Sequence, residues 1–269
     1  MSSVVSFVSS MNEKLYNEYG KTFLEEFDLN AGEEISLLNI HEKFNGPIIH
    51  SEKINNILFN DQDHEKFLKF FGKLYEAQGV TIKVVNENGQ QKLNIKNDFR
   101  FNAIKFSYKV FAIKYSLNFL KNEKFLIWTD ADLRCKKKFD LEDLKEFLPL
   151  ENELMSYLGR TKFPPINPYS ECGFLVFNLT HPFFDKFISR MIEIYLSGEI
   201  FSLKEWHDSW IWDHVRREFE QSNIIFKNLS GEKFEQLEHP FVNCNLGKYF
   251  DHLKGPRKSA GHSPKEDYI

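Results

Sequence analysis

Short apolar runs alternate with amphipathic segments along the first half of the chain. Runs rich in β-branched and aromatic residues predict strands, and apolar residues at helical spacing predict helices. The predicted strands cover 4–8, 33–40, 80–85 and 124–130, and the predicted helices cover 11–27, 64–77 and 103–120. Because strand and helix alternate, we expect an α/β fold, with a mostly parallel sheet and helices on both of its faces.

The second half of the chain is less regular. Strands are predicted at 153–159, 171–179 and 223–228, helices at 182–196 and 204–220, and a polar, basic tail at the end. No repeat, low-complexity block or Pro/Gly-rich linker divides the sequence. We therefore expect a nucleotide-binding type of half joined to a more variable half without a clean boundary.

The composition is that of a globular protein, with 42% hydrophobic and 28% charged residues. The 28 phenylalanines predict an aromatic core, and a net charge of -4 gives no reason to expect nucleic acid as a partner. No apolar run approaches the ~18 residues that span a bilayer. The N-terminus lacks the features of a signal peptide, and the three cysteines fit no zinc or CxxC spacing. These features indicate a cytoplasmic protein with reduced thiols.

Two carboxylates, Asp130 and Asp132, follow the buried-looking run FLIWT. Ligands bind beyond the carboxyl ends of parallel strands, and Mg²⁺ or Mn²⁺ typically takes one or two carboxylates together with substrate phosphates. A solvated loop that caps the strand is the alternative. The same spacing occurs in DQD at 61–63, where an amphipathic helix follows, so we interpret Asp61 as a helix N-cap.

A second motif lies near the end of the chain. HLKGPRK places His252, Gly255 and Lys258 in an H-x-x-G-x-x-K pattern that also contains Lys254 and Arg257. A neutral imidazole can ligate a divalent ion, glycine permits close approach of a phosphate, and the basic side chains suit a diphosphate. Taken alone, the motif is more typical of a basic solvated tail, but together with Asp-x-Asp it forms a complementary metal and diphosphate site.

The motifs FLIWTDAD and HLKGPRK together resemble those of the GT-A nucleotide-sugar glycosyltransferases, and the H-x-x-G-x-x-K spacing is most similar to glycosyltransferase family eight. The resemblance implies one compact GT-A (Rossmann-like) domain over 1–269. Residues 1–133 would form the nucleotide-sugar-binding half. Residues 134–269 would form the acceptor half, including the C-terminal metal- and diphosphate-binding segment.

The resemblance also implies an activity: transfer of a sugar, hexose foremost, from a nucleotide-diphosphate donor, with UDP-sugar favoured, to a glycan, lipid-linked or protein hydroxyl. Asp130 and Asp132 would hold Mn²⁺ or Mg²⁺ bound to the donor diphosphate, with His252 as the third protein ligand. When the sugar–phosphate bond breaks, that cation and nearby basic residues would stabilise the leaving diphosphate.

Three more residues receive donor-binding roles from the resemblance. Ser9 would lie beside the nucleoside, and Arg100 and Lys109 would contact the donor sugar or phosphate. A solvated helix surface is the alternative for Arg100 and Lys109. The polar tail after His252 is a candidate to order over the bound donor.

Two acidic residues are candidates for catalysis. Asp208 lies among three tryptophans in EWHDSWIWD and is a candidate for sugar contact, or for general base if the reaction inverts the anomeric centre. Glu171 precedes Gly173 at the start of a predicted strand, where a glycine would let substrate approach closely. The alternatives are a core helix for Asp208 and a core strand entry for Glu171.

Two other function classes remain open at this point. A nucleotidyltransferase or pyrophosphohydrolase would also need acids, a metal and basic residues, although no Gly-rich phosphate loop follows the first predicted strand. A non-catalytic nucleotide-sugar-binding module is the other alternative. Whether the reaction retains or inverts configuration also stays open.

Overall fold

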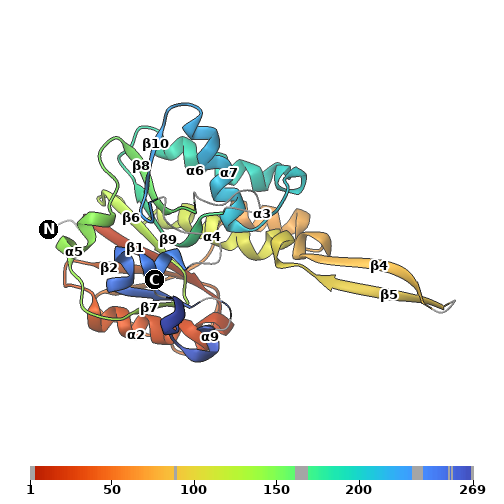
Figure 1. The fold of residues 1–269 in the computed structure, drawn as a ribbon, viewed down its shortest axis with the longest axis horizontal. Helices are drawn as coiled ribbons and strands as arrows, with labels where there is room; N and C mark the ends of the chain where they lie inside the picture. Colours follow the sequence, from red (N-terminus) through yellow and green to blue (C-terminus); the bar gives the residue numbers. More distant parts are fainter. Residues whose placement is uncertain are drawn as a thin grey trace.

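A seven-stranded sheet forms the centre of the computed structural model, which describes residues 4–87, 90–160, 169–231, 239–253, 255 and 257–267. The strand order is β10-β8-β9-β6-β1-β2-β3 (Figure 1). The strands are β1 (Val5–Met11), β2 (Ser36–His41), β3 (Ile54–Leu58), β6 (Phe125–Thr129), β8 (Glu153–Leu158), β9 (Glu171–Asn178) and β10 (Ile225–Asn228). β9 runs antiparallel to both of its neighbours, and the other pairings are parallel. The predicted α/β class, with a mixed, mostly parallel sheet, is confirmed.

Helices cover both faces of this sheet (Figure 1). One core contains buried residues of α3, α4, α6 and α7, and the other contains residues of α2 and of the C-terminal segment. The helices are α1 (Glu13–Leu15), α2 (Lys21–Asn30), α3 (Gln62–Phe71), α4 (Ala103–Ser116), α5 (Leu141–Leu144), α6 (Phe184–Leu196), α7 (Asp208–Glu220), α8 (Pro240–Asn243) and α9 (Arg257–Ala260). No helix in the part of the chain that the structure describes is long and apolar enough to cross a membrane.

Alternation along each central strand separates the two cores. On β1, Phe7 belongs to the core on the α2 side and Val8 to the core on the α4 side. On β6, Ile127 belongs to the α2 side and Leu126 to the α4 side. Ten of the twelve largest fully buried side chains are phenylalanines, which confirms the aromatic core.

Two small sheets lie outside the central one. β7 (Leu133–Cys135) pairs antiparallel with β11 (Phe250–His252), which brings the C-terminal segment back to the end of β6. β4 (Val80–Glu87) and β5 (Gln90–Asn97) form an antiparallel hairpin that projects away from the rest of the molecule (Figure 1).

Several element predictions need correction. The strand at 80–85 exists, but it belongs to the projecting hairpin, and β3 takes its expected place in the sheet. β3 was missed because its sequence, INNIL, interrupts the apolar run with two asparagines. The helix predicted over 11–27 is divided by a π-helical turn at Tyr16–Gly20. The polar tail after His252 contains α9, and the buried Ser263 within it donates to Asp251 at 2.6 Å.

The interpretation of the DQD stretch is confirmed. Asp61 caps α3, because its carboxylate accepts from the backbone N–H groups of Asp63 and His64 at 3.0 and 2.9 Å. The same carboxylate pairs with Lys114 at 2.9 Å. Asp61 therefore has the structural role that the sequence predicted for it.

Phe250 on β11 should make a large contribution to stability. Its buried ring lies 4.9 Å from the Phe139 ring and 5.9 Å from the Phe174 ring, centroid to centroid. We expect Phe250→Ala to lower the free energy of unfolding by about 3–5 kcal/mol, as for other buried phenylalanines. Urea denaturation checks this, with Phe99→Ala, a 65% exposed position, as the control. Equal losses in the two variants would contradict the anchoring role of Phe250.

Candidate active site

Asp130, Asp132 and His252 converge at the carboxyl end of β6. One potential ligand atom from each lies within 4.8 Å of the others. His252 Nε2 is 3.0 Å from Asp132 Oδ1 and 3.7 Å from Asp130 Oδ2. The structure thus brings together two motifs that are separated by 120 residues in the sequence.

Backbone pairing on three sides holds this arrangement. The Asp130 N–H donates to the Gly173 carbonyl of β9 at 3.1 Å, and the Leu253 N–H donates to the Asp132 carbonyl at 3.2 Å. In the β7–β11 ladder His252 lies opposite Leu133. Phe250, two residues before His252 on the same face of the strand, fixes β11 in the aromatic core.

Gly173 leaves room for the His252 ring. A Cβ at this position would lie 2.4 Å from both Cε1 and Nδ1 of the imidazole, which is closer than nonbonded carbon atoms approach. The expectation that this glycine makes space for substrate is therefore corrected. It makes space for the histidine of the candidate metal site.

Glu171 lies behind His252 and is fully buried. Its Oε1 is 3.1 Å from His252 Nδ1, and its Oε2 is 3.6 Å from a guanidinium nitrogen of Arg160. A carboxylate on the far nitrogen of a histidine is the arrangement that orients metal-ligating histidines. The catalytic role that the sequence suggested for Glu171 stays a prediction, and its contacts are those of a group that orients His252.

Lys109 of α4 connects the Asp-x-Asp motif to α7. Its Nζ lies 2.8 Å from Asp130 Oδ1, 2.5 Å from Asp208 Oδ2 and 3.0 Å from the Cys172 carbonyl. Trp128 Nε1 donates to the same Asp130 oxygen at 2.9 Å. The alternative of a solvated helix surface is wrong for Lys109, because the side chain is only 9% exposed.

Asp208 is the first residue of α7 and stays partly accessible, with 13% of its side chain exposed. Ahead of it, Glu205 accepts from the Tyr169 hydroxyl at 2.8 Å and pairs with His207 Nε2 at 3.0 Å. His207 Nδ1 lies 4.0 Å from Asp208 Oδ1. Asp208 is thus placed by Lys109 on one side and by the group of Tyr169, Glu205 and His207 on the other. Sequence reasoning did not identify Tyr169 as part of this group.

Among the described basic residues of the motif, Lys258 is the one that contacts the cluster of Asp130, Asp132 and His252. Its Nζ is 2.7 Å from Asp132 Oδ2 and lies over the Tyr19 ring. Arg257 turns away from the cluster and forms a bidentate pair with Asp267. Gly255 has a left-handed backbone with φ of 55°, and Lys254 lies outside the described residues.

In the part of the chain that the structure describes, neither Ser9 nor Arg100 forms a hydrogen bond or ion pair with Asp130, Asp132 or His252. Ser9 is fully buried on β1, and its hydroxyl has no hydrogen-bond partner in that part of the chain. Arg100 pairs with Asp98 at 2.7 Å and lies 3.9 Å from Glu205. Their donor-binding roles remain predictions.

The electrostatics of the cluster follow from its crowded carboxylates. Burial alone would raise the pKa of Asp132, but His252 and Lys258 outweigh it and hold that pKa well below its usual range. Burial would lower the pKa of His252, but Asp132 and Glu171 raise it to about 10. Burial would likewise lower the pKa of Lys109, but Asp130 and Asp208 raise it above its ordinary value.

The donor set fits a divalent cation. Two carboxylates suit Mn²⁺ or Mg²⁺. The raised pKa of His252 means that its imidazole is protonated in the metal-free site, so the cation would displace that proton before the imidazole completed the coordination of a manganese ion. Separations up to 4.8 Å between ligand atoms are close to those around one ion. Asp130 and Asp132 are partly exposed, so water and substrate oxygens can reach the open positions.

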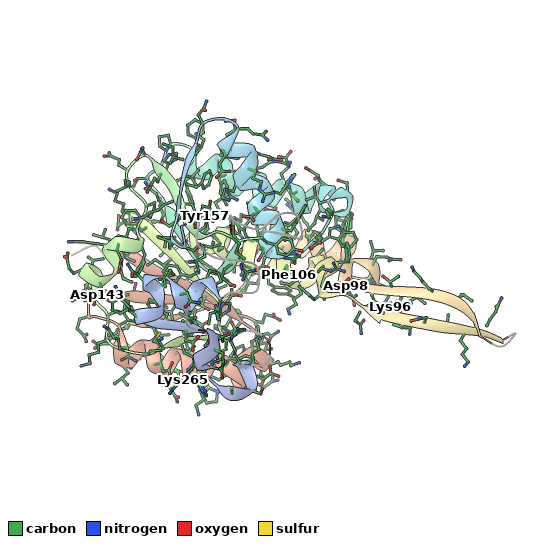
Figure 2. The ribbon with its side chains drawn as sticks, viewed as in Figure 1. Lys96, Asp98, Phe106, Asp143, Tyr157 and Lys265 are labelled. Carbon is green, nitrogen blue, oxygen red and sulfur yellow. The ribbon has the colours of Figure 1, made fainter. Side chains whose placement is uncertain are left out.

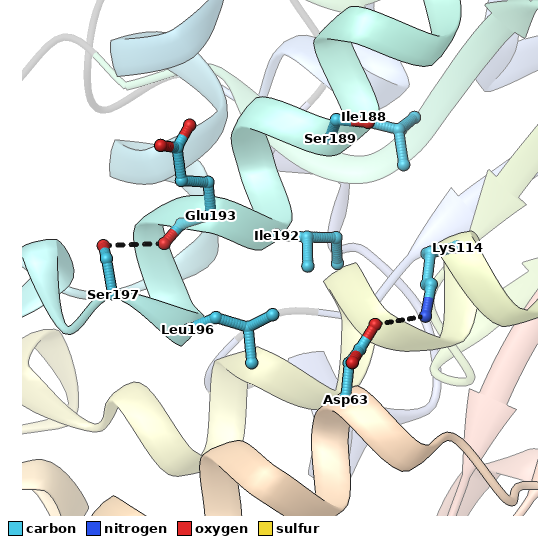
Figure 3. A pocket seen from close by; sticks show the side chains of 8 residues that line it. All are labelled: Asp63, Lys114, Ile188, Ser189, Ile192, Glu193, Leu196 and Ser197. Atoms are coloured by element: carbon cyan, nitrogen blue, oxygen red, sulfur yellow. Dashed lines mark hydrogen bonds and ion pairs between the residues drawn. The ribbon is translucent and has the colours of Figure 1, made fainter.

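A separate hollow of about 530 Å³ lies between α3, α4 and α6 (Figure 3). Its lining includes Ile188, Ile192 and Leu196 of α6 together with the ion pair of Asp63 and Lys114. None of the predicted site residues that the structure describes lines it. The candidate active site is therefore the cluster of Asp130, Asp132 and His252 rather than this hollow.

Comparison with known proteins found only distant structural likenesses. No protein-family model matches the chain, and no curated protein matches it in sequence. Among solved structures, a glycosyltransferase involved in the glycosylation of the major capsid of PBCV-1 is 8% identical, with a TM-score of 0.48 over 96% of each chain.

Two further structures show the same degree of likeness. The apo-form glycosyltransferase GlyE of Streptococcus pneumoniae TIGR4 is 13% identical, with a TM-score of 0.43 over 84% of this chain and 45% of the other. The apo form of mouse xyloside xylosyltransferase 1 is 12% identical, with a TM-score of 0.44 over 84% of each chain. With TM-scores below 0.5, these likenesses do not assign a function, which must come from the site residues.

The contact between Gly173 and His252 yields a sharp test. We expect Gly173→Ala to weaken Mn²⁺ binding at least about 10-fold, because the new methyl group displaces the imidazole by more than a metal–ligand bond tolerates. Titration of Mn²⁺ followed by electron paramagnetic resonance measures this in the absence of nucleotide. Gly46→Ala is the matched control, since nothing lies within 4 Å of its Cβ position. Equal affinity in the two variants would contradict the placement of His252 in the metal site.

Proposed function

We propose that this chain is a metal-dependent GT-A glycosyltransferase that transfers a sugar from a nucleotide-diphosphate donor to a hydroxyl acceptor. The observation that carries the proposal is the meeting of Asp130, Asp132 and His252 at the carboxyl end of a central strand, with Lys258 2.7 Å from Asp132. Carboxylates, an imidazole and an ammonium group at one accessible point suit a metal diphosphate.

The finer assignment rests on the motif resemblance. The H-x-x-G-x-x-K spacing favours glycosyltransferase family eight, a UDP-sugar donor and a hexose. The predicted halves, 1–133 for the donor and 134–269 for the acceptor, agree with Asp130 lying at the end of β6 and Asp208 starting α7. A glycan, lipid-linked or protein hydroxyl would accept the sugar.

Asp130, Asp132 and His252 would hold Mn²⁺ or Mg²⁺, and the bound ion would neutralise charge that builds on the departing diphosphate. The protein's own cations act beside it. Lys258 is close enough to exchange its contact with Asp132 for a diphosphate oxygen, which adds positive charge where the leaving group becomes more negative.

Asp208 would act on the sugar side of the broken bond. The bond between the anomeric carbon and the phosphate oxygen breaks, and a bond from that carbon to the acceptor oxygen forms. The acceptor proton passes to Asp208 if configuration inverts. In either stereochemical course a nearby carboxylate stabilises the oxocarbenium-like transition state. Lys109 orients Asp208, because its Nζ is 2.5 Å from the carboxylate.

Asp208→Asn should separate catalysis from binding. We expect turnover of the preferred UDP- or GDP-hexose with Mn²⁺ to fall at least about 100-fold, while metal-dependent nucleotide binding persists, because the variant keeps the metal ligands. Chromatography of nucleotide products measures the rate, and Glu220→Gln at the far end of α7 is the control.

The same chromatograms distinguish the other function classes. Release of nucleoside diphosphate is the result expected of a glycosyltransferase. Release of sugar phosphate and nucleoside monophosphate would instead identify a pyrophosphohydrolase. Tight donor binding without turnover over a panel of acceptors would identify a binding module.

A further inference from the structure

The hairpin of β4 and β5, which we name the arm (residues 80–97), exposes an unusual amount of apolar surface. Half of the sixteen exposed large hydrophobic side chains in the described part of the chain lie between residues 70 and 99. They comprise Ile82, Val84, Leu93 and Ile95 on the arm, and Phe70, Leu74, Tyr75 and Phe99 in the segments at its base.

The four side chains named on the arm, Ile82, Val84, Leu93 and Ile95, share one face. Ile82 lies opposite Ile95, and Val84 lies opposite Leu93, with each pair two residues from the next. They are between 45% and 68% exposed, as the projection of the arm in Figure 1 leads one to expect. This stripe belongs to neither of the two cores of the molecule.

The opposite face of the arm is basic. Lys83 lies opposite Asn94, and Lys96 lies opposite Thr81. Lys96 can be followed in Figure 2, where it lies along the arm beyond Asp98. An isolated two-stranded hairpin is marginally stable at best in water and needs a further layer on its apolar face. The arm as it stands therefore lacks the layer that would stabilise it.

We propose that a second copy of this chain provides that layer, with the apolar faces of two arms packed against each other. An isologous pairing places the stripe of one arm on the stripe of the other without bringing any lysine into the contact. The basic faces then point outward. Pairing through those faces would instead oppose like charges, so the distribution of side chains selects the apolar face.

Charge favours a second copy over an anionic membrane surface. Residues 80–97 contain three lysines and one glutamate, so the arm carries +2 and the remainder of the chain -6 of the net -4. When the two arms lie antiparallel about a twofold axis, the tip of each basic arm reaches toward the acidic body of the other copy, so this attraction opposes the repulsion between the two arms. The same acidic body would be repelled by anionic lipids.

The available area is adequate for a dimer. Eight side chains, each more than two-fifths exposed, offer on the order of 800 Å² per copy, close to the roughly 800 Å² per partner of a standard specific interface. The four residues of the stripe supply about half of this area. The four residues at the base of the arm, Phe70, Leu74, Tyr75 and Phe99, supply the other half of the area if the partner copy covers them as well.

Sedimentation velocity over a wide concentration range tests the proposal on the full-length chain. We expect a monomer–dimer equilibrium whose dissociation constant rises at least about 10-fold in Val84→Asp/Leu93→Asp. Leu29→Asp/Leu150→Asp is the matched control, since these residues are 71% and 63% exposed and lie elsewhere on the surface. Far-UV circular dichroism verifies that each variant is folded.

Cross-linking adds a readout of proximity. In the Val84→Cys or Leu93→Cys variant, a short bismaleimide should cross-link two copies of the chain. In the Lys83→Cys variant, whose substitution lies on the opposite face of the arm, it should not. Three outcomes would overturn the proposal: a monomer at every concentration, a dimer unaffected by the arm substitutions, or a monomer that binds anionic vesicles through the same residues.

Discussion

The candidate site depends on one electrostatic constraint: carboxylates are crowded in a largely buried volume and need cations between them. Asp130, Asp132, Glu171 and Asp208 lie around His252 and Lys109. Repulsion between carboxylates this close would be strong at low effective dielectric, so each is held beside a positive or hydrogen-bonding partner. A divalent cation and a diphosphate fit this arrangement, because the ion satisfies the two aspartates and Lys258 can then turn to the phosphate.

The fold brings these groups together through elements that are distant in sequence. Asp130 follows β6, Asp208 begins α7, and His252 arrives on β11, which the aromatic contacts of Phe250 secure. Gly173 removes the side chain that would otherwise occupy the position of the imidazole. Packing in the core therefore determines the geometry of the site as much as the charged residues do.

The two Asp-x-Asp stretches show how far sequence reasoning reaches. One precedes a helical pattern and the other follows an apolar strand, and that local context distinguished an N-cap at Asp61 from a candidate metal-ligating pair at Asp130 and Asp132. The strand–helix alternation likewise predicted the α/β sheet and the helices on its two faces.

Other features depend on contacts that no local pattern reports. The pairing of Lys109 with Asp208 spans 99 residues, and the contact of Glu171 with His252 becomes visible only when β9 and β11 are placed. The strand predicted over 80–85 was assigned to the sheet because its alternation has the period of a half-buried strand, whereas in the structure it forms part of the arm, whose apolar face is exposed.

Calorimetric titration of UDP and GDP, with and without Mn²⁺, tests the central claim most directly. The wild-type chain should bind one nucleotide in a manganese-dependent manner, Asp132→Ala should lose that dependence, and Asp63→Ala, from the other Asp-x-Asp, should keep it. Binding that is the same in all three proteins, or binding of neither nucleotide, would contradict the assignment of Asp130, Asp132 and His252 as a metal–diphosphate site.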